Sequence, residues 1–398
     1  MHPALRQTID QVRAAAAART PLRLRGGGTK DFHGPRGPAG LQGSLLDTRA
    51  LAGIVSYEPS ELVVTAWAGT PLAQLEAALA ERRQCLPFEP PHFAAPDAGA
   101  AATVGGMVAA GLSGPARVSV GAVRDYVLGL HLVNGRGEAL CFGGQVMKNV
   151  AGYDVSRLMV GAWGTLGLIT QVSLKVLPVA PAEATLRFAC TQAEALQRVL
   201  DGARQPLPLN ASSWVAVGSN GDSDAGGDGN GARRGDMQQP GCLHVRLRGA
   251  AAAVEEACRT LGGERLDAQE AAAHWQACRE QTLPWFATRA PTHALWRLSL
   301  PATAPVLALP ATASAPLLEW HGALRWVQAP LADAAALAEA ARAVGGSASI
   351  FRAHDAGGYL QKDLFGLQSP ALQKIHARVR AAFDPAGIFN PGRMGLDG

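Results

Sequence analysis

Glycines at the ends of short apolar segments constrain this chain more than any other feature. Three of its 46 glycines follow one another at Gly26–Gly28, directly after the strand-like residues 22–25. Glycine lets backbone N–H groups approach a ligand closely, and Thr29 adds a hydroxyl donor. This run predicts a turn whose N–H groups converge on an anion such as a pyrophosphate, with a plain turn as the alternative.

The run matches neither of the two common nucleotide-binding fingerprints. A Walker loop closes with Gly-Lys-Ser/Thr, and no such sequence follows Gly28. A Rossmann GxGxxG that starts at Gly26 needs glycine where Asp31 stands, and one that starts at Gly28 needs glycine where Lys30 stands. The meaning of the run therefore depends on the segments that follow it.

A second glycine segment starts at Thr103, where Gly105 and Gly106 open a short helix of small residues. The glycine pair permits close approach of a ligand, and the N-terminus of a helix favours negative charge. Packing of this helix against a sheet is the alternative interpretation.

Two more segments precede apolar strands. In the first, Arg124 and Asp125 follow Gly121, and an exposed ion pair of little energy is the plain interpretation. In the second, Gly161–Thr170 is rich in glycine and leads through Gly167 and Ile169 into a strand. Each of these segments is a modest signal by itself.

Strand and helix patterns alternate along the chain and predict an α+β protein of two domains. We expect a first domain over 1–180 and a second over 181–371, because the glycine motifs thin out near Pro178–Pro181. A polar, glycine-rich stretch at 218–241 predicts a disordered loop. The tail 372–398 starts as a helix.

Two local signals mark boundaries inside the first domain. Thr70 and Pro71 predict the start of a helix, with the Thr70 hydroxyl at the cap and the proline in the first turn. Asn134-Gly135 stands between two strand-like segments and predicts a hairpin turn.

The composition excludes several classes of protein. The net charge of +4 with no basic block argues against nucleic-acid binding. No signal-type apolar run opens the chain, and four prolines interrupt the apolar stretch 300–320, so no transmembrane segment is expected. We expect a cytoplasmic protein, and docking at the inner face of the cytoplasmic membrane through a partner is compatible with that.

Cysteines and histidines give no metal signal. The six cysteines form no CxxC pair, which argues against a disulfide framework and against an iron–sulfur cluster held by this chain alone. We expect no metal, because the histidines lack ligand spacing and Asp222, Asp224 and Asp228 lack the EF-hand pattern. These histidines, interpreted as structural, are His244, His274, His293, His321 and His354.

Taken together, the segments resemble the FAD domain of the p-cresol methylhydroxylase and vanillyl-alcohol oxidase flavoproteins. More closely, the whole chain resembles the FAD-binding subunits of bacterial glycolate oxidase complexes. The resemblance is dense over 20–180 and 372–394. It rests on Arg25–Thr29, Leu46–Arg49, Thr103–Met107, Gly121–Asp125, Lys148–Asp154, Gly164–Thr170, Leu295–Leu298 and Phe383–Arg393.

The resemblance implies a two-subdomain FAD-binding domain followed by a second α+β domain of the FAD-linked oxidase kind, with the tail returning to the first. It implies that FAD binds through Arg25, Gly26, Gly27, Gly28, Thr29, Thr103, Gly105, Gly106, Gly121, Arg124, Asp125, Gly167, Ile169 and Asn390. Some relatives attach flavin to a histidine of the first loop. Thr29 stands in that neighbourhood here, so we expect non-covalent FAD and interpret His33 as a surface or loop residue.

The resemblance also implies oxidation of glycolate or a similar 2-hydroxy acid alongside a second FAD subunit and an iron–sulfur subunit. Catalytic relatives carry a histidine cluster in the second domain that this sequence lacks, so FAD binding is better supported than independent catalysis. The alternatives are a self-sufficient 2-hydroxy-acid dehydrogenase and a structural or electron-relay subunit. An arginine can clamp a carboxylate or serve ordinary pairing, and the candidates are Arg279, Arg289, Arg297 and Arg325.

Overall fold

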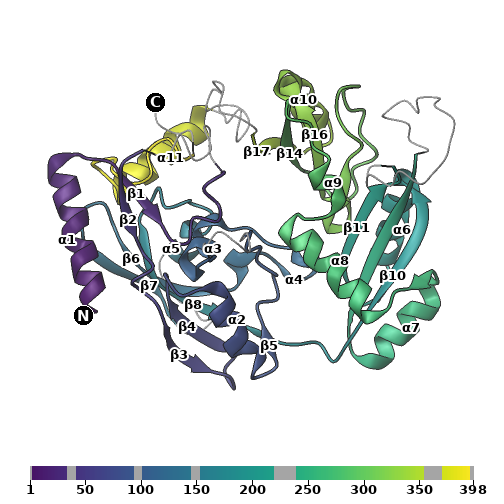
Figure 1. The fold of residues 1–398 in the computed structure, drawn as a ribbon, viewed down its shortest axis with the longest axis horizontal. Helices are drawn as coiled ribbons and strands as arrows, with labels where there is room; N and C mark the ends of the chain where they lie inside the picture. The colour runs from purple at the N-terminus through teal and green to yellow at the C-terminus, as the bar shows by residue number, and fades with distance from the viewer. Residues whose placement is uncertain are drawn as a thin grey trace. The chain divides into compact units, whose positions relative to one another are not determined.

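A computed structural model describes residues 2–33, 42–93, 101–144, 153–218, 239–353 and 370–394. The chain divides into two units (Figure 1). Unit 1 comprises Met1–Ser113, Ala122–Val179 and Asp355–Gly398, and unit 2 comprises Gly114–Gly121 and Ala180–His354. Unit 2 thus takes in α4 (Arg117–Val120) and Gly121, which lie within the first domain that the sequence predicts.

Unit 1 is built on an antiparallel sheet with the strand order β3-β4-β8-β6-β7. Its strands are β3 (Ile54–Glu58), β4 (Val63–Trp67), β6 (Val127–Val133), β7 (Ala139–Gly143) and β8 (Leu168–Lys175). An Asn134-Gly135 turn joins β6 to β7, as the sequence predicts, and the Asn134 side chain accepts hydrogen bonds from the amides of Arg136 and Glu138. A short pair, β5 (Gln84–Cys85) with β9 (Leu177–Pro178), lies apart from this sheet.

Helices α2 (Leu72–Ala80) and α3 (Val104–Ala110) share the main apolar core of unit 1 with this sheet. Leu72, Leu75 and Leu79 recur at helical spacing and are fully buried. The predicted cap of α2 at Thr70 is wrong. Pro71 holds the N-cap position, because the Thr70 hydroxyl instead donates to the carbonyl oxygen of Trp67 at 2.7 Å.

A smaller core lies where the two ends of the chain meet. Strand β1 (Leu22–Arg25) pairs in parallel with β2 (Ser44–Asp47), and α1 (Pro3–Ala18) packs against them. The segment after α11 (Pro370–Phe383) returns to β1 (Figure 1). There Phe389 forms a parallel bridge with Leu22. Phe389 is fully buried, so the tail is part of the fold of unit 1.

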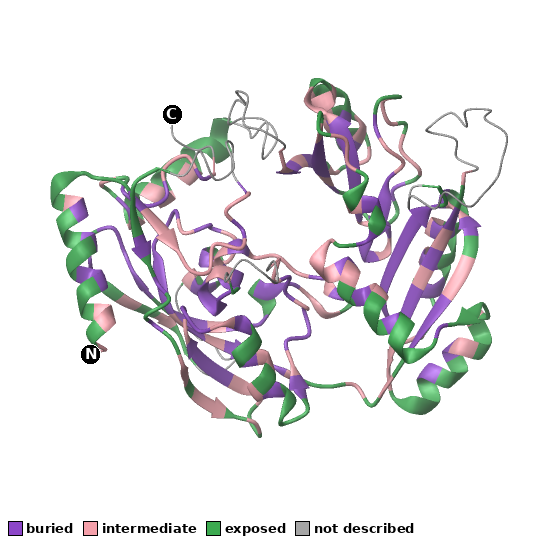
Figure 2. Cartoon of the chain, viewed as in Figure 1, coloured by how far each residue is buried: buried purple, intermediate pink, exposed green. Residues whose placement is uncertain are grey.

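Unit 2 is built on an antiparallel sheet of eight strands in the order β13-β10-β12-β11-β15-β16-β14-β17. The strands are β10 (Ala182–Thr191), β11 (Leu209–Ala216), β12 (Pro240–Gly249), β13 (Glu264–Arg265), β14 (His293–Ser299), β15 (Leu317–Glu319), β16 (Leu324–Pro330) and β17 (Ser347–Arg352). Many residues of these strands are buried (Figure 2). The mixture of helices and antiparallel sheets in the two units confirms the predicted α+β class.

Helices of the same unit include α6 (Gln192–Ala203), α7 (Ala251–Leu261), α8 (Ala268–Glu280), α9 (Pro284–Ala287) and α10 (Ala334–Ala343). Thr191 and Glu194 begin α6 with a capping box, which satisfies backbone N–H groups that no helical bond can reach. Shorter helical segments of the chain are α5 (Val155–Met159), η2 (Val123–Asp125), η3 (Trp320–Gly322) and η4 (Leu331–Asp333).

Only the two ends of the predicted loop 218–241 lie within the described residues. Residues 219–238 lie outside the described residues, so that part of the prediction stays untested. At the far end the prediction is wrong, because Pro240 and Gly241 begin β12 and pair with Thr191 and Cys190 of β10. Sequence patterns do not predict this end of the strand, because glycine and proline are both rare inside strands.

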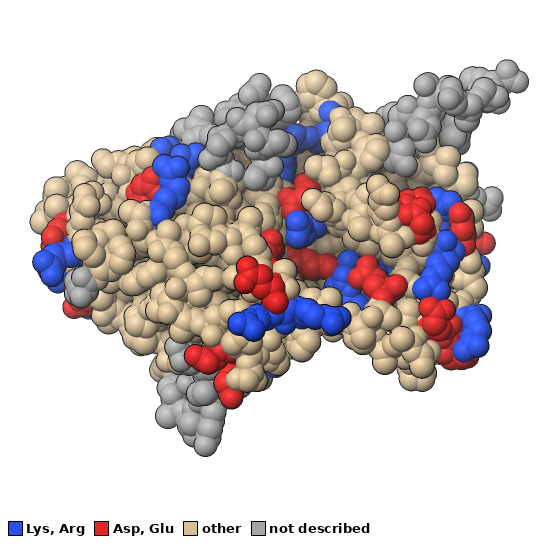
Figure 3. Space-filling model, turned by 60° about the horizontal axis from the view of Figure 1, so that its bottom comes forward, with Lys and Arg blue, Asp and Glu red and all other residues tan. Residues whose placement is uncertain are grey.

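None of the helices in the described residues is long and apolar enough to cross a membrane. On the face drawn in Figure 3, basic and acidic side chains are interspersed over a largely uncharged surface. That face therefore offers no broad field of one sign of the kind that attracts nucleic acid.

Candidate functional site

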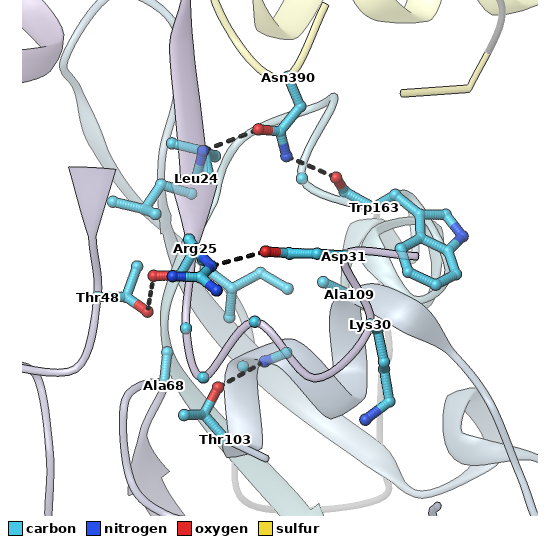
Figure 4. Close-up of a pocket in the computed structure, with 18 of the residues that line it drawn as sticks. Leu24, Arg25, Lys30, Asp31, Thr48, Ala68, Thr103, Ala109, Trp163 and Asn390 are labelled. Atoms are coloured by element: carbon cyan, nitrogen blue, oxygen red, sulfur yellow. Dashed lines mark hydrogen bonds and ion pairs between the residues drawn. The ribbon is translucent and has the colours of Figure 1, made fainter. Parts of the chain in front are cut away.

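A pocket in unit 1 brings together segments from both ends of the chain (Figure 4). Most of the residues that the sequence predicts to bind a cofactor line it. These are Arg25, Gly26, Gly27, Gly28, Thr29, Thr103, Gly105, Gly106, Gly167, Ile169 and Asn390. The pocket therefore joins the first glycine loop, the start of α3, the approach to β8 and the C-terminal tail.

The glycine loop presents backbone donors for which the described residues supply no acceptor. Within the described part of the chain, the amides of Gly26, Gly27, Gly28 and Thr29 donate to no acceptor. Gly28 has a φ of +74°, a left-handed conformation that favours glycine. N–H groups that converge on a pocket in this way can bind an anion.

Two of these glycines are also required by packing. A Cβ on Gly27 would lie 1.6 Å from the carbonyl oxygen of Ala101, and a Cβ on Gly26 would lie 2.3 Å from Oγ1 of Thr103. Neither position leaves room for a side chain. The loop consequently lies directly against the segment that begins α3.

Thr103 is the N-cap of α3, and its Oγ1 accepts a hydrogen bond from the Gly106 amide at 3.3 Å. A Cβ on Gly105 would lie 2.6 Å from the Cβ of Ala68, so this glycine lets α3 pack closely on the end of β4. Gly106 has more room, with its nearest contact at 3.0 Å. The packing interpretation thus holds for Gly105, whereas Gly106 is the more open of the pair.

Asn390 holds two walls of the pocket together. Its Oδ1 accepts a hydrogen bond from the Leu24 amide at 2.8 Å, and its Nδ2 donates to the Trp163 carbonyl oxygen at 2.8 Å (Figure 4). Both oxygen and nitrogen of the side-chain amide are therefore engaged by the protein. Asn390 also has a φ of +42°, which asparagine tolerates better than most residues.

Arg393 is a buried cation of this pocket that sequence reasoning misses. Its Nη2 donates to the Lys30 carbonyl oxygen at 2.8 Å, while its Nε is buried without a hydrogen-bond partner in the described residues. Burial lowers the pKa of Arg393 to about 10, so the group stays charged near neutral pH. Its guanidinium lies 5.1 Å from the centre of the Trp163 ring.

Lys30 adds a second cation to the same wall. Its Nζ donates to Thr29 Oγ1 and to the His92 carbonyl oxygen, each at 3.2 Å. Arg25, by contrast, is paired with Asp31 at 2.7 Å. No spacing in the sequence indicates that Arg393 and Lys30 meet, because 363 residues separate them.

The expectation that His33 is a surface or loop residue holds only in part. It lies in an irregular segment, but it is buried rather than on the surface, and its ring stacks on Trp163 at 4.1 Å between centroids. Aromatic packing explains the burial, because the flat face of Trp163 offers a large contact area.

Three predicted residues do not line the pocket. Gly121 ends α4 in unit 2 with a φ of +98°. Asp125 accepts a hydrogen bond from the Ala122 amide at 2.8 Å and so caps η2, and Arg124 is exposed. Residues 145–152, which include most of the Lys148–Asp154 motif, lie outside the described residues.

In unit 2, two histidines that look scattered in the sequence are neighbours. The rings of His244 and His274 stack with centroids 3.8 Å apart, and Ser213 Oγ lies 2.8 Å from Nε2 of His274. Burial lowers the pKa of His244 to about 4 and that of His274 to about 3, so both are neutral at pH 7. The described residues contain no group of three or more ligands that could hold a metal, and His354 lies outside them.

The comparisons with known proteins agree with this geometry. A family described as an FAD binding domain matches residues 5–143. The chain is 41% identical over 97% of its length to the glycolate oxidase subunit GlcE of Escherichia coli, of which it covers 96%. It is 34% identical over 48% of its length to a D-lactate dehydrogenase of Archaeoglobus fulgidus, of which it covers 41%.

A solved structure of alkyldihydroxyacetonephosphate synthase matches with a TM-score of 0.60 and 14% identity, over 97% of this chain and 74% of that one. At 14% identity the match shows similarity of fold alone. The fold of the chain is therefore one already known from experiment.

Proposed function

Because the chain belongs to the family of the glycolate oxidase subunit GlcE, we propose that it is the FAD-binding subunit of a complex that oxidises glycolate to glyoxylate. The chain is an FAD-dependent oxidoreductase of this family. The observation that carries the proposal is the row of amides at Gly26–Thr29 that donate to no described residue, beside the buried charge of Arg393. Similarity over nearly the whole chain supports the choice of substrate.

The residues of the pocket fit the pyrophosphate of FAD. Free N–H groups and cations are what two adjacent phosphates need, and Arg393 keeps an Nε without a partner in the described residues. In our proposal the amides of Gly26–Thr29 bind phosphate oxygens, and Arg393 and Lys30 offset their charge. When bound, FAD supplies the acceptor for the two electrons that leave the alcohol carbon.

The other residues of the pocket position the loop. Asn390 ties Leu24 of β1 to Trp163, so the loop after β1 starts from a fixed point. Glycine at 26 and 27 lets that loop lie on the segment before α3. The side chain of Thr29 has no nitrogen to which a flavin could be attached. We therefore propose that FAD is held without a covalent bond.

We propose that electrons leave to partner subunits, which include a second FAD subunit and an iron–sulfur subunit. The relatives support part of this: a glycolate oxidase subunit GlcD of Bacillus subtilis is 32% identical over 42% of this chain, and the chain covers 34% of it. We propose a cytoplasmic location, at the inner face of the membrane where a partner docks there.

An anaerobic titration with glycolate tests the proposal. The chain is purified alone and together with its partner subunits, and the flavin absorption is followed. We expect the flavin of the assembled complex to bleach and that of the chain alone to stay oxidised. Bleaching in the chain alone would favour the self-sufficient dehydrogenase, and no bleaching in the complex would contradict glycolate oxidation.

A further inference from the structure

Arg297 in β14 carries a charge for which the described part of unit 2 supplies no hydrogen-bonded partner. Its Nε is buried without an acceptor, and its guanidinium makes no hydrogen bond with any described residue. A buried donor without an acceptor is costly, so folded proteins rarely leave one without a reason.

Two other arginines of the same unit, Arg325 and Arg246, are buried and hydrogen-bonded. The guanidinium of Arg325 donates to the carbonyl oxygens of Ala304 and Pro305, both at 2.6 Å. Arg246 donates from Nε to Asn210 at 2.6 Å. Among the described residues, the Nε atoms of Arg279 and Arg352 are also buried without a hydrogen-bond partner, but Arg279 has the carboxylate of Glu280 2.9 Å away. The fold can thus pair a buried guanidinium, whereas that of Arg297 makes no hydrogen bond or ion pair with a described residue.

Charges around Arg297 make its surroundings positive. The guanidinium carbons of Arg117 and Arg297 lie 4.4 and 5.1 Å from the centre of the Trp320 ring. Burial and, next, the charge of Arg117 lower the pKa of Arg297 to about 10, and Glu319 opposes them less strongly. Two guanidinium groups and one carboxylate leave one formal positive charge.

The turn that carries Trp320 is strained and firmly held. Trp320 and His321 have φ angles of +52° and +56°, in the left-handed region that bulky residues avoid. Trp320 donates from Nε1 to the Gly114 carbonyl oxygen at 2.9 Å, and the His321 amide donates to Ser212 Oγ at 3.1 Å. Strain of this kind, fixed by surrounding contacts, gathers at functional sites.

We propose that Arg297, beside the ring of Trp320, forms a binding site in unit 2 for a small monocarboxylate. The planar fork of a guanidinium matches the two oxygens of a carboxylate. One excess positive charge suits a monoanion. The identity of the ligand as a 2-hydroxy acid rests on the proposed function, whereas the anion site itself does not.

The test is a titration of the full-length, FAD-loaded chain with acetate, which has no hydroxyl to oxidise, and with glycolate under anaerobic conditions. Melting temperature and tryptophan fluorescence are followed at constant ionic strength. A ligand that binds only the folded state raises its stability with a saturable dependence on concentration. We expect this rise in the wild type and a roughly tenfold or greater loss of affinity in Arg297→Gln, since hydrogen bonds to charged groups are strong.

Arg198→Gln is the matched control, because it removes an exposed arginine of unit 2 that lies over Phe188. It should bind as the wild type does. If Arg297→Gln fails to fold, Arg297→Lys keeps the charge without the fork and is expected to bind several-fold more weakly. Equal binding by the Arg297 variants, or no saturable binding in the wild type, would overturn the site.

The result separates this inference from the proposed function. Glycolate that bleaches the flavin of the complex equally in wild type and Arg297→Gln would leave the function standing and remove the site. Saturable binding that depends on Arg297, with no bleaching in the complex, would support the site and contradict glycolate oxidation.

Discussion

Asn390 donates a hydrogen bond from Nδ2 to the carbonyl oxygen of Trp163, 2.8 Å away and 227 residues earlier in the chain. Through its Oδ1 the same side chain accepts from the Leu24 amide. The C-terminal tail therefore fixes the strand that leads into the glycine loop, and so helps to build the pocket that we propose for FAD.

Replacing Asn390 by alanine should weaken unit 1. The partly buried Leu24 amide and the buried Trp163 carbonyl oxygen lose their partner, which costs about 2–4 kcal/mol in the free energy of unfolding. Asn390→Asp keeps the acceptor for Leu24 but sets a buried carboxylate oxygen against the Trp163 carbonyl oxygen, so its loss should be at least as large. Urea unfolding of the three proteins checks the order, and an unchanged midpoint in Asn390→Ala would contradict the role of this side chain.

Replacing Arg393 by methionine should weaken FAD binding by roughly tenfold or more, because a charged hydrogen-bond donor is lost beside the phosphates. Folding should suffer little, since the variant also removes a buried group with an unpaired Nε in the described residues. Fluorescence titration of the FAD-free chain gives the affinity. Arg6→Gln, an exposed charge change in α1, is the control, and equal affinities for all three proteins would exclude Arg393 from the site.

The two glycines of α3 should respond differently to alanine. Gly105→Ala places a Cβ 2.6 Å from that of Ala68 and should cost about 1–3 kcal/mol of stability, as overpacking does. Gly106→Ala meets only Thr103 Oγ1 at 3.0 Å and should affect FAD affinity more than stability. Thermal unfolding and FAD titration of both variants check this prediction. A larger loss of stability in Gly106→Ala than in Gly105→Ala would contradict it.

Acid should destabilise unit 2. Burial lowers the pKa of His244 and His321 to about 4, and that of His274 to about 3, from 6.5. Below pH 6.5 the unfolded chain binds protons that the folded chain refuses, so stability falls as the pH drops from about 6.5 toward 4. One such histidine accounts for about 3 kcal/mol at the acid end.

Unfolding midpoints measured from neutral pH down through this window check the prediction. His321→Gln should flatten the dependence in proportion to one titrating group. A stability that stays constant across the window would show that these histidines do not titrate as their burial implies.

Local patterns identify the glycine loop, the start of α3 and the returning tail, because each depends on residues adjacent in sequence. Contacts across long separations stay hidden: Arg393 reaches Lys30 only after the tail has joined β1. The stacking of His244 on His274 likewise depends on how α8 packs near β12. Sequence spacing carries no signal for either pair.

The central claim is that FAD binds through the loop Gly26–Thr29, and the flavin content of the purified chain tests it most directly. Gly27→Ala places a Cβ 1.6 Å from the Ala101 carbonyl oxygen, whereas Gly144→Ala meets nothing within 4 Å. We predict an equimolar amount of flavin in the wild type and in Gly144→Ala, and a large loss in Gly27→Ala with the unfolding of unit 2 unchanged. A wild-type chain without flavin, or a Gly27→Ala variant that keeps all of it, would contradict binding through this loop.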